Sequence, residues 1–193
     1  MTIAADLTPW LLGLGLFLAL GFAGLWNALV RSGNKVQEAF SGIDVQLKRR
    51  HDLVPNLVRV VKAYATHERE ALEDVVEARN AAQAAEALPD REAREVGLQA
   101  SLGKLFALVE AYPELKADGN FRKLHGDLVE IEDALQYARR YYNGAVRDYN
   151  NRVEAIPSSL VAGIAGRAVE PYFQIDDAAE SAVPRIDFDG DAA

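Results

Sequence analysis

Residues 36–61 read VQEAFSGIDVQLKRRHDLVPNLVRVV, and their apolar positions recur at alternating steps of four and three residues. A repeat that averages 3.5 residues is typical of an α-helix that buries one stripe, or seam, of its surface against other helices. The seam continues at the same steps as far as Val75. Its positions are Val36, Phe40, Ile43, Leu47, Arg50, Val54, Leu57, Val61, Tyr64, Glu68, Ala71 and Val75. The pattern predicts one long helix in an all-α fold.

Pro55 stands inside this predicted helix. Proline removes one backbone hydrogen bond and kinks a helix, but the seam keeps its phase across Pro55, which favours a single kinked helix. In the alternative, a new helix begins with Asp52 as its N-cap, and Pro55 falls in the first turn, where a missing N–H does no harm. We favour the kinked helix.

On the N-terminal side of the seam, residues 9–30 read PWLLGLGLFLALGFAGLWNALV and contain no charged side chain. About 20 helical residues cross the hydrocarbon core of a bilayer. The stretch therefore predicts a single transmembrane helix, preceded by a short N-terminus of residues 1–8. The competing interpretation is a cleaved signal peptide with Gly21-Phe22-Ala23 as its processing site. No basic segment precedes the stretch, which is also long for a signal, so we favour the uncleaved anchor.

The charges that flank the apolar stretch predict its orientation. Asp6 precedes it, whereas Arg31 and Lys35 follow it, and basic residues collect on the cytoplasmic side of a membrane. Trp10 and Trp26 stand near its two ends, where indole rings favour the headgroup region. We therefore expect the N-terminus outside, these two tryptophans with Arg31 and Lys35 at the membrane interfaces, and a cytoplasmic body.

On the C-terminal side of the seam, two further helices are predicted. One follows the break at Leu88-Pro89-Asp90, and the other follows the turn at Asp118-Gly119-Asn120 and is closed by Pro157. Their seams comprise Leu98, Leu102, Leu105, Val109 and Tyr112, and then Phe121, Leu124, Leu128, Ile131, Leu135, Ala138, Tyr142, Ala145, Tyr149, Arg152 and Ile156. Residues 31–167 should form a long antiparallel helical bundle or coiled-coil rod of three helices.

The stretch 168–193 differs in composition from the helices. Its acidic residues are opposed by Arg185 alone, and Pro171, Pro184 and Gly190 interrupt any helix. A segment of this kind repels itself and buries little apolar surface. We expect a flexible acidic C-terminal tail.

Polar side chains on the seams are the candidate functional residues. Arg50, Glu68 and Arg152 replace apolar residues, and a buried charge is unfavourable unless a partner neutralises it. The pairs Tyr142-Asn143 and Tyr149-Asn150 lie seven residues apart, so their amides could hydrogen-bond to a neighbouring helix. We expect helix-seam or subunit contacts from Arg50, Glu68, Tyr142, Asn143, Tyr149, Asn150 and Arg152. Regular seams also pack against second copies, which predicts a homo-oligomer.

The composition argues against several classes of function. The formal net charge is −8 and no dense basic block occurs, so nucleic acid is a poor partner. The chain has no cysteine, hence no thiol nucleophile or thiolate metal site. His51 and His125 are isolated, and His67 with Glu68 or Glu70 lacks a second histidine within a turn or two. We therefore expect no catalytic residue, no metal and no cofactor.

Residues 40–50, FSGIDVQLKRR, and residues 52–58, DLVPNLV, closely resemble the LemA family. Further blocks resemble the family in the same order, namely Val61-Lys62-Ala63-Tyr64-Ala65, Tyr112-Pro113-Glu114-Leu115-Lys116-Ala117, Asn120-Phe121, Tyr142-Asn143, Tyr149-Asn150, Pro157-Ser158, Tyr172-Phe173 and Pro184-Arg185-Ile186-Asp187-Phe188. The chain departs from the family pattern at Phe40, at His51 and near Gly166-Arg167, which affects local packing. The resemblance implies a bacterial inner-membrane protein with an outward N-terminus and a cytoplasmic helical domain.

The resemblance adds no catalytic residues. It implies two kinds of role, because relatives include a magnetosome-formation protein and proteins encoded beside a membrane metalloprotease. We expect a non-enzymatic scaffold that self-assembles through its helical domain and organises or shapes the inner membrane. The alternative is an adaptor that presents a helical face or its tail to a membrane partner, such as a protease or an envelope-stress component.

Overall fold

The computed structural model describes residues 3–86 and 88–173, with side chains from residue 9 onward. This part of the chain is all-α, as predicted. The helices are α1 (Ile3–Tyr64), α2 (Arg69–Ala84), α3 (Leu88–Val109), α4 (Pro113–Ala117), α5 (Gly119–Glu154) and α6 (Ser158–Ile164). The described chain contains more helices than the three expected, because a turn divides the first predicted helix into α1 and α2, and because the short helices α4 and α6 lie outside the three predicted ones.

Helix α1 is the axis of the molecule. Its 62 residues continue through Pro55 without a break, and at about 1.5 Å per residue they extend roughly 93 Å. Asp52 caps no new helix, since it lies within α1 and pairs with Lys48 at 3.0 Å. The alternative of a helix that restarts at Asp52 is therefore wrong, and the in-phase seam was the correct guide.

The predicted first helix ends earlier than its seam. α1 stops at Tyr64, residues 65–68 form a turn, and α2 runs back along α1. The turn is about one helical turn long in sequence, so the apolar repeat stays in phase on both sides and does not reveal it. Leu72 and Val75 of α2 are buried in one cluster with Val61 of α1, and the reversal of the chain brings the two helices together.

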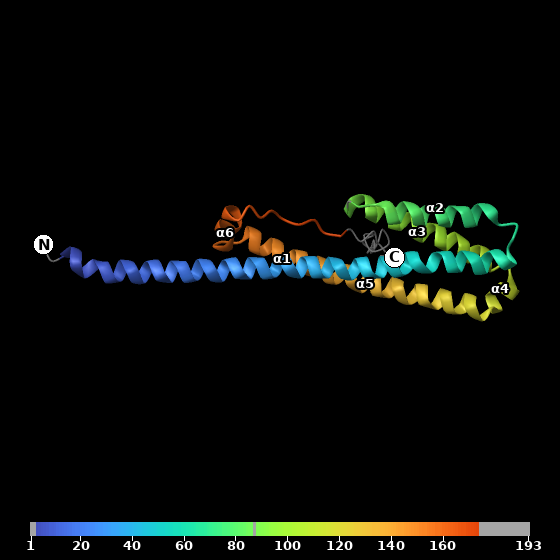
Figure 1. Ribbon diagram of the computed structural model, residues 1–193, viewed down its shortest axis with the longest axis horizontal. Coiled ribbons are helices and arrows are strands. Elements are labelled where there is room, and N and C mark those ends of the chain that lie inside the picture. Colours follow the sequence, from blue (N-terminus) through green and yellow to red (C-terminus); the bar gives the residue numbers. More distant parts are fainter. Residues whose placement is uncertain (1–2, 87, 174–193) are drawn as a thin grey trace, which may run out of the picture.

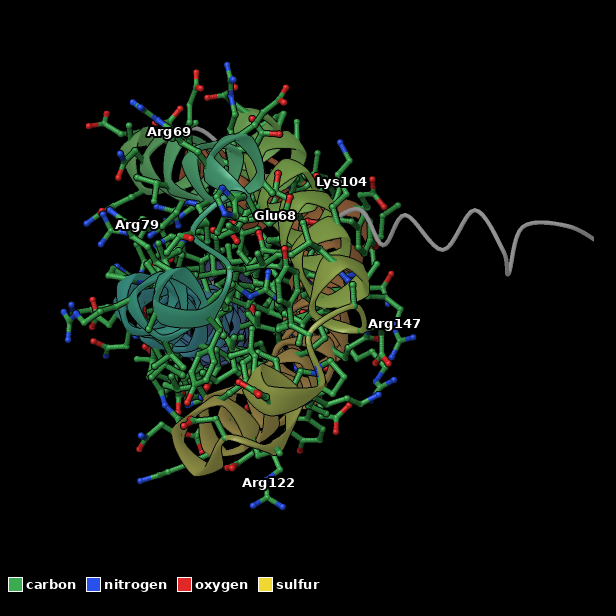
Figure 2. The ribbon with its side chains drawn as sticks, turned by 90° about the vertical axis from the view of Figure 1, so that its right-hand side faces the viewer. Glu68, Arg69, Arg79, Lys104, Arg122 and Arg147 are labelled. Carbon is green, nitrogen blue, oxygen red and sulfur yellow. The ribbon has the colours of Figure 1, made fainter. Side chains whose placement is uncertain are left out.

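Two apolar clusters make up the core. α1 packs along α5, and α2 packs against both α3 and α1 (Figure 1). The distal cluster, far from the free end of α1, contains Val54, Leu57, Val75, Leu98, Leu105, Leu115, Phe121 and Leu128, among others. The proximal cluster contains Leu29, Val36, Ile43, Leu47, Leu135, Tyr142, Tyr149, Ala162 and Phe173, among others. Charged side chains such as Arg69, Lys104, Arg122 and Arg147 point away from the bundle (Figure 2).

The first part of α1 stands free of the bundle (Figure 1). Its most apolar 18-residue window has a mean hydropathy of 1.8, and only 6% of that window is buried. Trp10 is 78% exposed and Phe17 73% exposed. A core helix of a soluble domain would bury these side chains. In the described part of the chain this is the one helix with the length and composition of a membrane anchor.

The part of the chain that packs on the bundle extends farther towards the C-terminus than expected. Residues 168–173, assigned above to the acidic tail, run in extended form along the bundle, and Phe173 is 3% exposed in the proximal cluster. The tail boundary expected at Ala168 therefore falls inside the folded part of the chain. Residues 174–193, where the rest of the predicted tail lies, are outside the described residues.

Candidate functional site: a buried charge network and a C-terminal clasp

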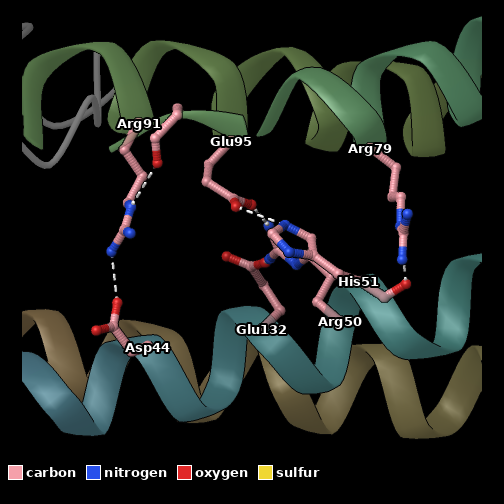
Figure 3. A network of polar contacts seen from close by, with 8 residues as sticks. Asp44, Arg50, His51, Arg79, Arg91, Glu95 and Glu132 are labelled. Atoms are coloured by element: carbon pink, nitrogen blue, oxygen red, sulfur yellow. Dashed lines mark hydrogen bonds and ion pairs between the residues drawn. The ribbon is translucent and has the colours of Figure 1, made fainter. Parts of the chain in front are cut away.

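A network of charged side chains separates the two apolar clusters. Arg50 lies on α1 between Leu47 of the proximal cluster and Val54 of the distal cluster. Its guanidinium donates to Glu95 of α3 at 3.4 Å and forms a short ion pair with Glu132 of α5 (Figure 3). The Arg50 and Glu95 side chains are 3% and 1% exposed. Three helices therefore meet at one buried cation.

His51 joins the same network. Its Nε2 lies 2.7 Å from the second carboxylate oxygen of Glu95, and its backbone carbonyl accepts a hydrogen bond from Arg79 of α2 at 3.2 Å (Figure 3). The interpretation of His51 as an isolated polar histidine is thus wrong, because the side chain is buried. Through His51 and Arg79, α2 is tied to the network that links the other three long helices.

The electrostatics of the network favour a structural role. Burial lowers the pKa of Arg50, and the neighbouring Glu95 carboxylate opposes that shift. Burial likewise lowers the pKa of Arg139, against the pull of Glu95 and Glu92. The carboxylates of Glu95 and Glu132 both pair with the Arg50 guanidinium. A paired set of charges at one level of a bundle can fix the register of its helices.

The geometry offers little room for a substrate at the network. The cavity that reaches Arg50 and Glu132, between α3 and α5, has a volume of about 240 Å³ and is walled by Phe106 and His125. Small-molecule sites usually occupy about 300–1,000 Å³. Within the described residues, no group of three or more His, Asp or Glu side chains is placed to hold a metal ion.

Two asparagines on α5 form a clasp for the C-terminal segment. The Asn150 side-chain amide donates to the carbonyl of Glu170 at 2.9 Å and accepts from its N–H at 2.8 Å. Asn143 makes the same pair of bonds with Phe173, at 2.9 and 2.8 Å. Each amide thus satisfies the backbone of one residue as a neighbouring β-strand would. We call these two asparagines, with residues 170–173, the clasp.

The spacing within the clasp follows from elementary geometry. Seven residues of helix separate the asparagines, about 10.5 Å, and three residues of extended chain, about 10 Å, separate Glu170 from Phe173. Tyr142 adds a hydrogen bond from its hydroxyl to the Pro171 carbonyl at 3.0 Å. From the sequence we expected the two asparagines to hydrogen-bond to a neighbouring helix. In the structure both bind this strand-like segment instead.

Arg139 connects the clasp with the charge network. Its guanidinium carbon lies 5.1 Å from the centre of the Phe173 ring, and the ring of Tyr142 meets Phe173 edge-on at 6.5 Å. The Glu95 carboxylate acts on Arg139 electrostatically. The Nε of Arg139 and the Oε1 of Glu132 have no hydrogen-bond partner in the structure. The clasp therefore lies next to Arg139, whose buried Nε has no hydrogen-bond partner.

The remaining predicted residues lie elsewhere. Glu68 is half-buried in the turn between α1 and α2 (Figure 2). It accepts a hydrogen bond from the Tyr112 hydroxyl at 2.8 Å, and this bond raises the pKa of Tyr112. Arg152 is exposed at the end of α5, off the intrachain seam. Tyr142 and Tyr149 are buried in the proximal cluster. These residues do not converge on one site.

The predicted membrane-interface residues lie on α1. Trp26 is 39% exposed and its ring lies 6.1 Å from that of Phe22. Arg31 is exposed. Lys35 pairs with Asp148 of α5 at 3.9 Å and lies 5.8 Å from the centre of the Tyr141 ring. The charges that indicated the orientation thus stand where α1 enters the bundle.

Sequence reasoning missed Glu95, Glu132, Arg139 and Phe173. Glu132 looks like an ordinary surface residue of a charged helix, and nothing in its spacing marks it as a partner of Arg50. Two signals were available. Arg50 is a charge on a seam and requires a buried counter-charge, and Glu95 stands three residues before Leu98, where the seam of that helix would continue. Phe173 carried a weaker signal as an aromatic residue just before an acidic stretch.

Fold and site together define a helical bundle built on one long helix that begins as an apolar, unburied segment. The chain belongs to the LemA family, whose model matches residues 39–188. It is also 25% identical to magnetosome protein MamQ 2 of Paramagnetospirillum magneticum and to magnetosome protein MamQ of Magnetospirillum gryphiswaldense. Each match covers 82% of this chain and 68% of the relative.

Proposed function

We propose that this chain is a non-enzymatic, single-pass protein of a bacterial inner membrane whose cytoplasmic bundle self-assembles as a scaffold. The observation that carries the proposal is the continuity of α1, which runs as one helix from the apolar free segment to the far end of the bundle. A body built on the same helix as its anchor keeps a fixed relation to the membrane. That is a property that a scaffold needs and an enzyme does not.

The charge network supports a rigid body. Arg50, His51, Glu95 and Glu132 join α1, α3 and α5 between two apolar clusters, so the long helices are held in one register. Because the buried Arg50 guanidinium pairs with Glu95 and Glu132 of its own chain, it is not available as a subunit contact. A contact between copies must use another surface.

Tyr137 and Tyr141 form the best candidate for that surface, which we call the tyrosine strip. They lie one turn apart on α5, and Tyr137 is 68% exposed while Tyr141 is 43% exposed. Tyrosine is enriched in protein interfaces because its ring buries a large area at little entropic cost. The relatives named as magnetosome proteins are designated by a cellular structure and not by a reaction, which agrees with a structural role.

Sizing the full-length protein in mild detergent tests this proposal. The wild type should form a defined oligomer by mass photometry, and the double variant Tyr137→Glu/Tyr141→Glu should shift it towards monomer. Val129→Glu is the matched control, because Val129 is exposed on the same helix. Since the chain has no cysteine, Tyr137→Cys also allows thiol crosslinking in membranes. A wild type that stays monomeric at all concentrations and gives no crosslink contradicts self-assembly.

An adaptor role is the second candidate, and a groove between α1 and α2 favours it. The groove has a volume of about 810 Å³, an apolar floor that includes Val58, Leu72 and Val76, and charged residues along its rim. Amphipathic helices commonly bind such grooves. In pull-downs from membranes, Val76→Glu should remove a groove-bound partner, and Val96→Glu on α3 is the exposed control. Deleting residues 174–193 should remove a partner that binds the tail but leave a scaffold assembled.

A further inference from the structure

The short helix α6 and the turn before it carry an unusual apolar surface. Beyond the free segment of α1, the described chain exposes only three leucine or isoleucine side chains, and all three lie here. Ile156 is 86% exposed, Leu160 is 68% exposed and Ile164 is 74% exposed. Leu160 and Ile164 stand one turn apart on the same face of α6. We call these three residues the apolar tip.

The register of α1 against α5 gives the height of the tip along α1. Phe40 packs against Tyr142, with ring centres 5.7 Å apart. Gly33 lies seven residues before Phe40 on α1, and Tyr149 lies seven residues after Tyr142 on α5. These two residues are also neighbours, since a Cβ added to Gly33 would lie 3.5 Å from the Tyr149 ring. A further step of five residues on each helix brings Glu154, the last residue of α5, level with Ala28 of α1, and Ile156 follows in the turn after α5. The antiparallel pairing therefore carries the tip past the end of the bundle.

The packing of α6 agrees with this placement. Its residue Ala162 is buried in the same cluster as Leu29 of α1, and Ala165, just after α6, packs against that cluster. Figure 1 shows α6 beside α1 at the point where α1 leaves the bundle towards its N-terminus. One side of α6 is thus fixed on α1 near Leu29, while Leu160 and Ile164 face outward.

This height coincides with the end of the charge-free stretch. Ala28 stands two residues before Val30, the last residue of that stretch, which is about 3 Å along a helix. Interfacial helices bury their apolar face about 5–10 Å into the boundary between headgroups and acyl chains. The tip follows the end of α5 directly in the chain, so it lies at the edge of this boundary region, on the same side of the membrane as the bundle.

Charged residues around the tip fit a lipid surface. Although the chain carries a net charge of −8, exposed Arg31, Arg152 and Arg167 stand at this end of the bundle. Arginines at this height can reach anionic headgroups. Glu154, the last residue of α5, is also exposed here and limits how deeply the tip can enter.

We propose that the apolar tip is a second membrane contact, which inserts into the leaflet from which α1 emerges. The occupant of this surface is the lipid bilayer, because α6 packs against α1 at Leu29, which lies within the charge-free stretch 9–30 of the proposed anchor. The bundle is then held at two points and has one orientation to the membrane. This inference rests on the proposed anchoring of α1 in a bilayer.

The absence of cysteine allows a direct test in the full-length protein. Leu160→Cys, labelled with an environment-sensitive fluorophore, is reconstituted in vesicles of phosphatidylcholine and phosphatidylglycerol with a quencher lipid whose doxyl group lies near the headgroup. Leu18→Cys, measured with a lipid whose doxyl group lies near the end of the acyl chain, marks the bilayer interior, and Val129→Cys marks the aqueous surface of α5. We expect at least about twofold stronger quenching at 160 than at 129, because interfacial residues lie within reach of the quencher. Ile164→Cys should behave like Leu160→Cys.

Other outcomes overturn the inference in distinguishable ways. If position 18 is quenched while 160 and 164 behave like 129, the anchor is present and the tip is not in lipid. A blue-shifted emission at 160 without quenching by the doxyl lipid means that a second copy or another protein covers the tip. If position 18 is not quenched either, the proposed anchoring fails together with this inference. Far-ultraviolet circular dichroism confirms that each variant is folded before it is compared.

Discussion

Asn150 and Glu170 are joined by two hydrogen bonds of 2.9 and 2.8 Å, in which one side-chain amide serves both backbone groups of a residue twenty positions away. Asn143 repeats the arrangement with Phe173. The C-terminal segment is therefore fixed to α5 without forming a helix or a sheet. Its attachment depends on two side chains, which makes it easy to test.

Removing either amide should release the clasp. Asn150→Ala loses two hydrogen bonds, each of which contributes about 0.5–1.5 kcal/mol, so we expect a destabilisation of about 1–3 kcal/mol. Limited proteolysis should then cut between residues 165 and 173 faster than in the wild type. Asn151→Ala is the control, since Asn151 is exposed on the same helix. Equal cleavage rates in all three proteins would show that the amides do not hold the segment.

Phe173 should be the main apolar contribution of the clasp. Its side chain is 3% exposed between Tyr142 and Arg139. Truncating a buried phenylalanine removes apolar contact and leaves a cavity, so Phe173→Ala should lower the free energy of unfolding by about 3 kcal/mol. Denaturant titration of the detergent-solubilised protein measures this. Tyr172→Ala, at a site that is 50% exposed, should change it by less than about 1 kcal/mol.

Breaking the charge network should be more harmful than replacing it. Arg50→Met leaves the Glu95 carboxylate buried without its cation, which should destabilise the bundle by about 3–5 kcal/mol. The double variant Arg50→Met/Glu95→Leu removes the more deeply buried of the two carboxylates that lose their cation, Glu95 and Glu132, and should recover at least half of that loss. Arg49→Met, at the exposed neighbouring position, should be close to neutral. A double variant less stable than Arg50→Met would mean that Glu95 contributes through His51 instead.

Acid should weaken the start of α5 through Asp118. Asp118 is the N-cap of α5 and accepts a hydrogen bond from the Phe121 N–H at 2.9 Å, which lowers its pKa from the ordinary value of 3.8. Because the folded pKa is the lower one, this stabilisation is fully present above pH 3.8 and disappears as the pH falls through the folded pKa.

Asp118→Asn keeps a capping oxygen but removes the titration. Its denaturation midpoint should therefore fall less than that of the wild type between pH 5 and pH 2, which denaturant titrations at several pH values can measure. Asp133→Asn, an exposed change on the same helix, should follow the wild type. Identical acid profiles for the wild type and Asp118→Asn would refute the assignment.

Much of the architecture could be read from local pattern. The 3.5-residue repeat predicted the helices and the passage of α1 through Pro55, because burial of one face imposes a period that any reader can count. The stretch 9–30 predicted the free apolar segment, because its length and lack of charge are those of a helix that crosses a bilayer. The turn at residues 65–68 escaped, since a break one helical turn long preserves the phase of the repeat.

The candidate site was only half visible in the sequence. Arg50 and the two Tyr-Asn pairs stood out because polar groups on a seam need partners. Their partners were harder to identify. Glu95 continues the seam of Leu98 by one step, but its position alone does not name Arg50 as its partner. Glu132 is an ordinary glutamate in a charged helix, and the backbone of residues 170–173 has no sequence signature.

The sequence by itself thus determined that the chain is helical, where its apolar segment lies and which polar residues require burial. Each of these depends on the spacing of residues within one helix. Only the tertiary structure decided which carboxylates neutralise Arg50, that the asparagines hold an extended segment, and that α6 lies level with the end of the apolar segment. These relations depend on the register between helices far apart in sequence, and many registers satisfy the same apolar repeat until all the side chains pack at once.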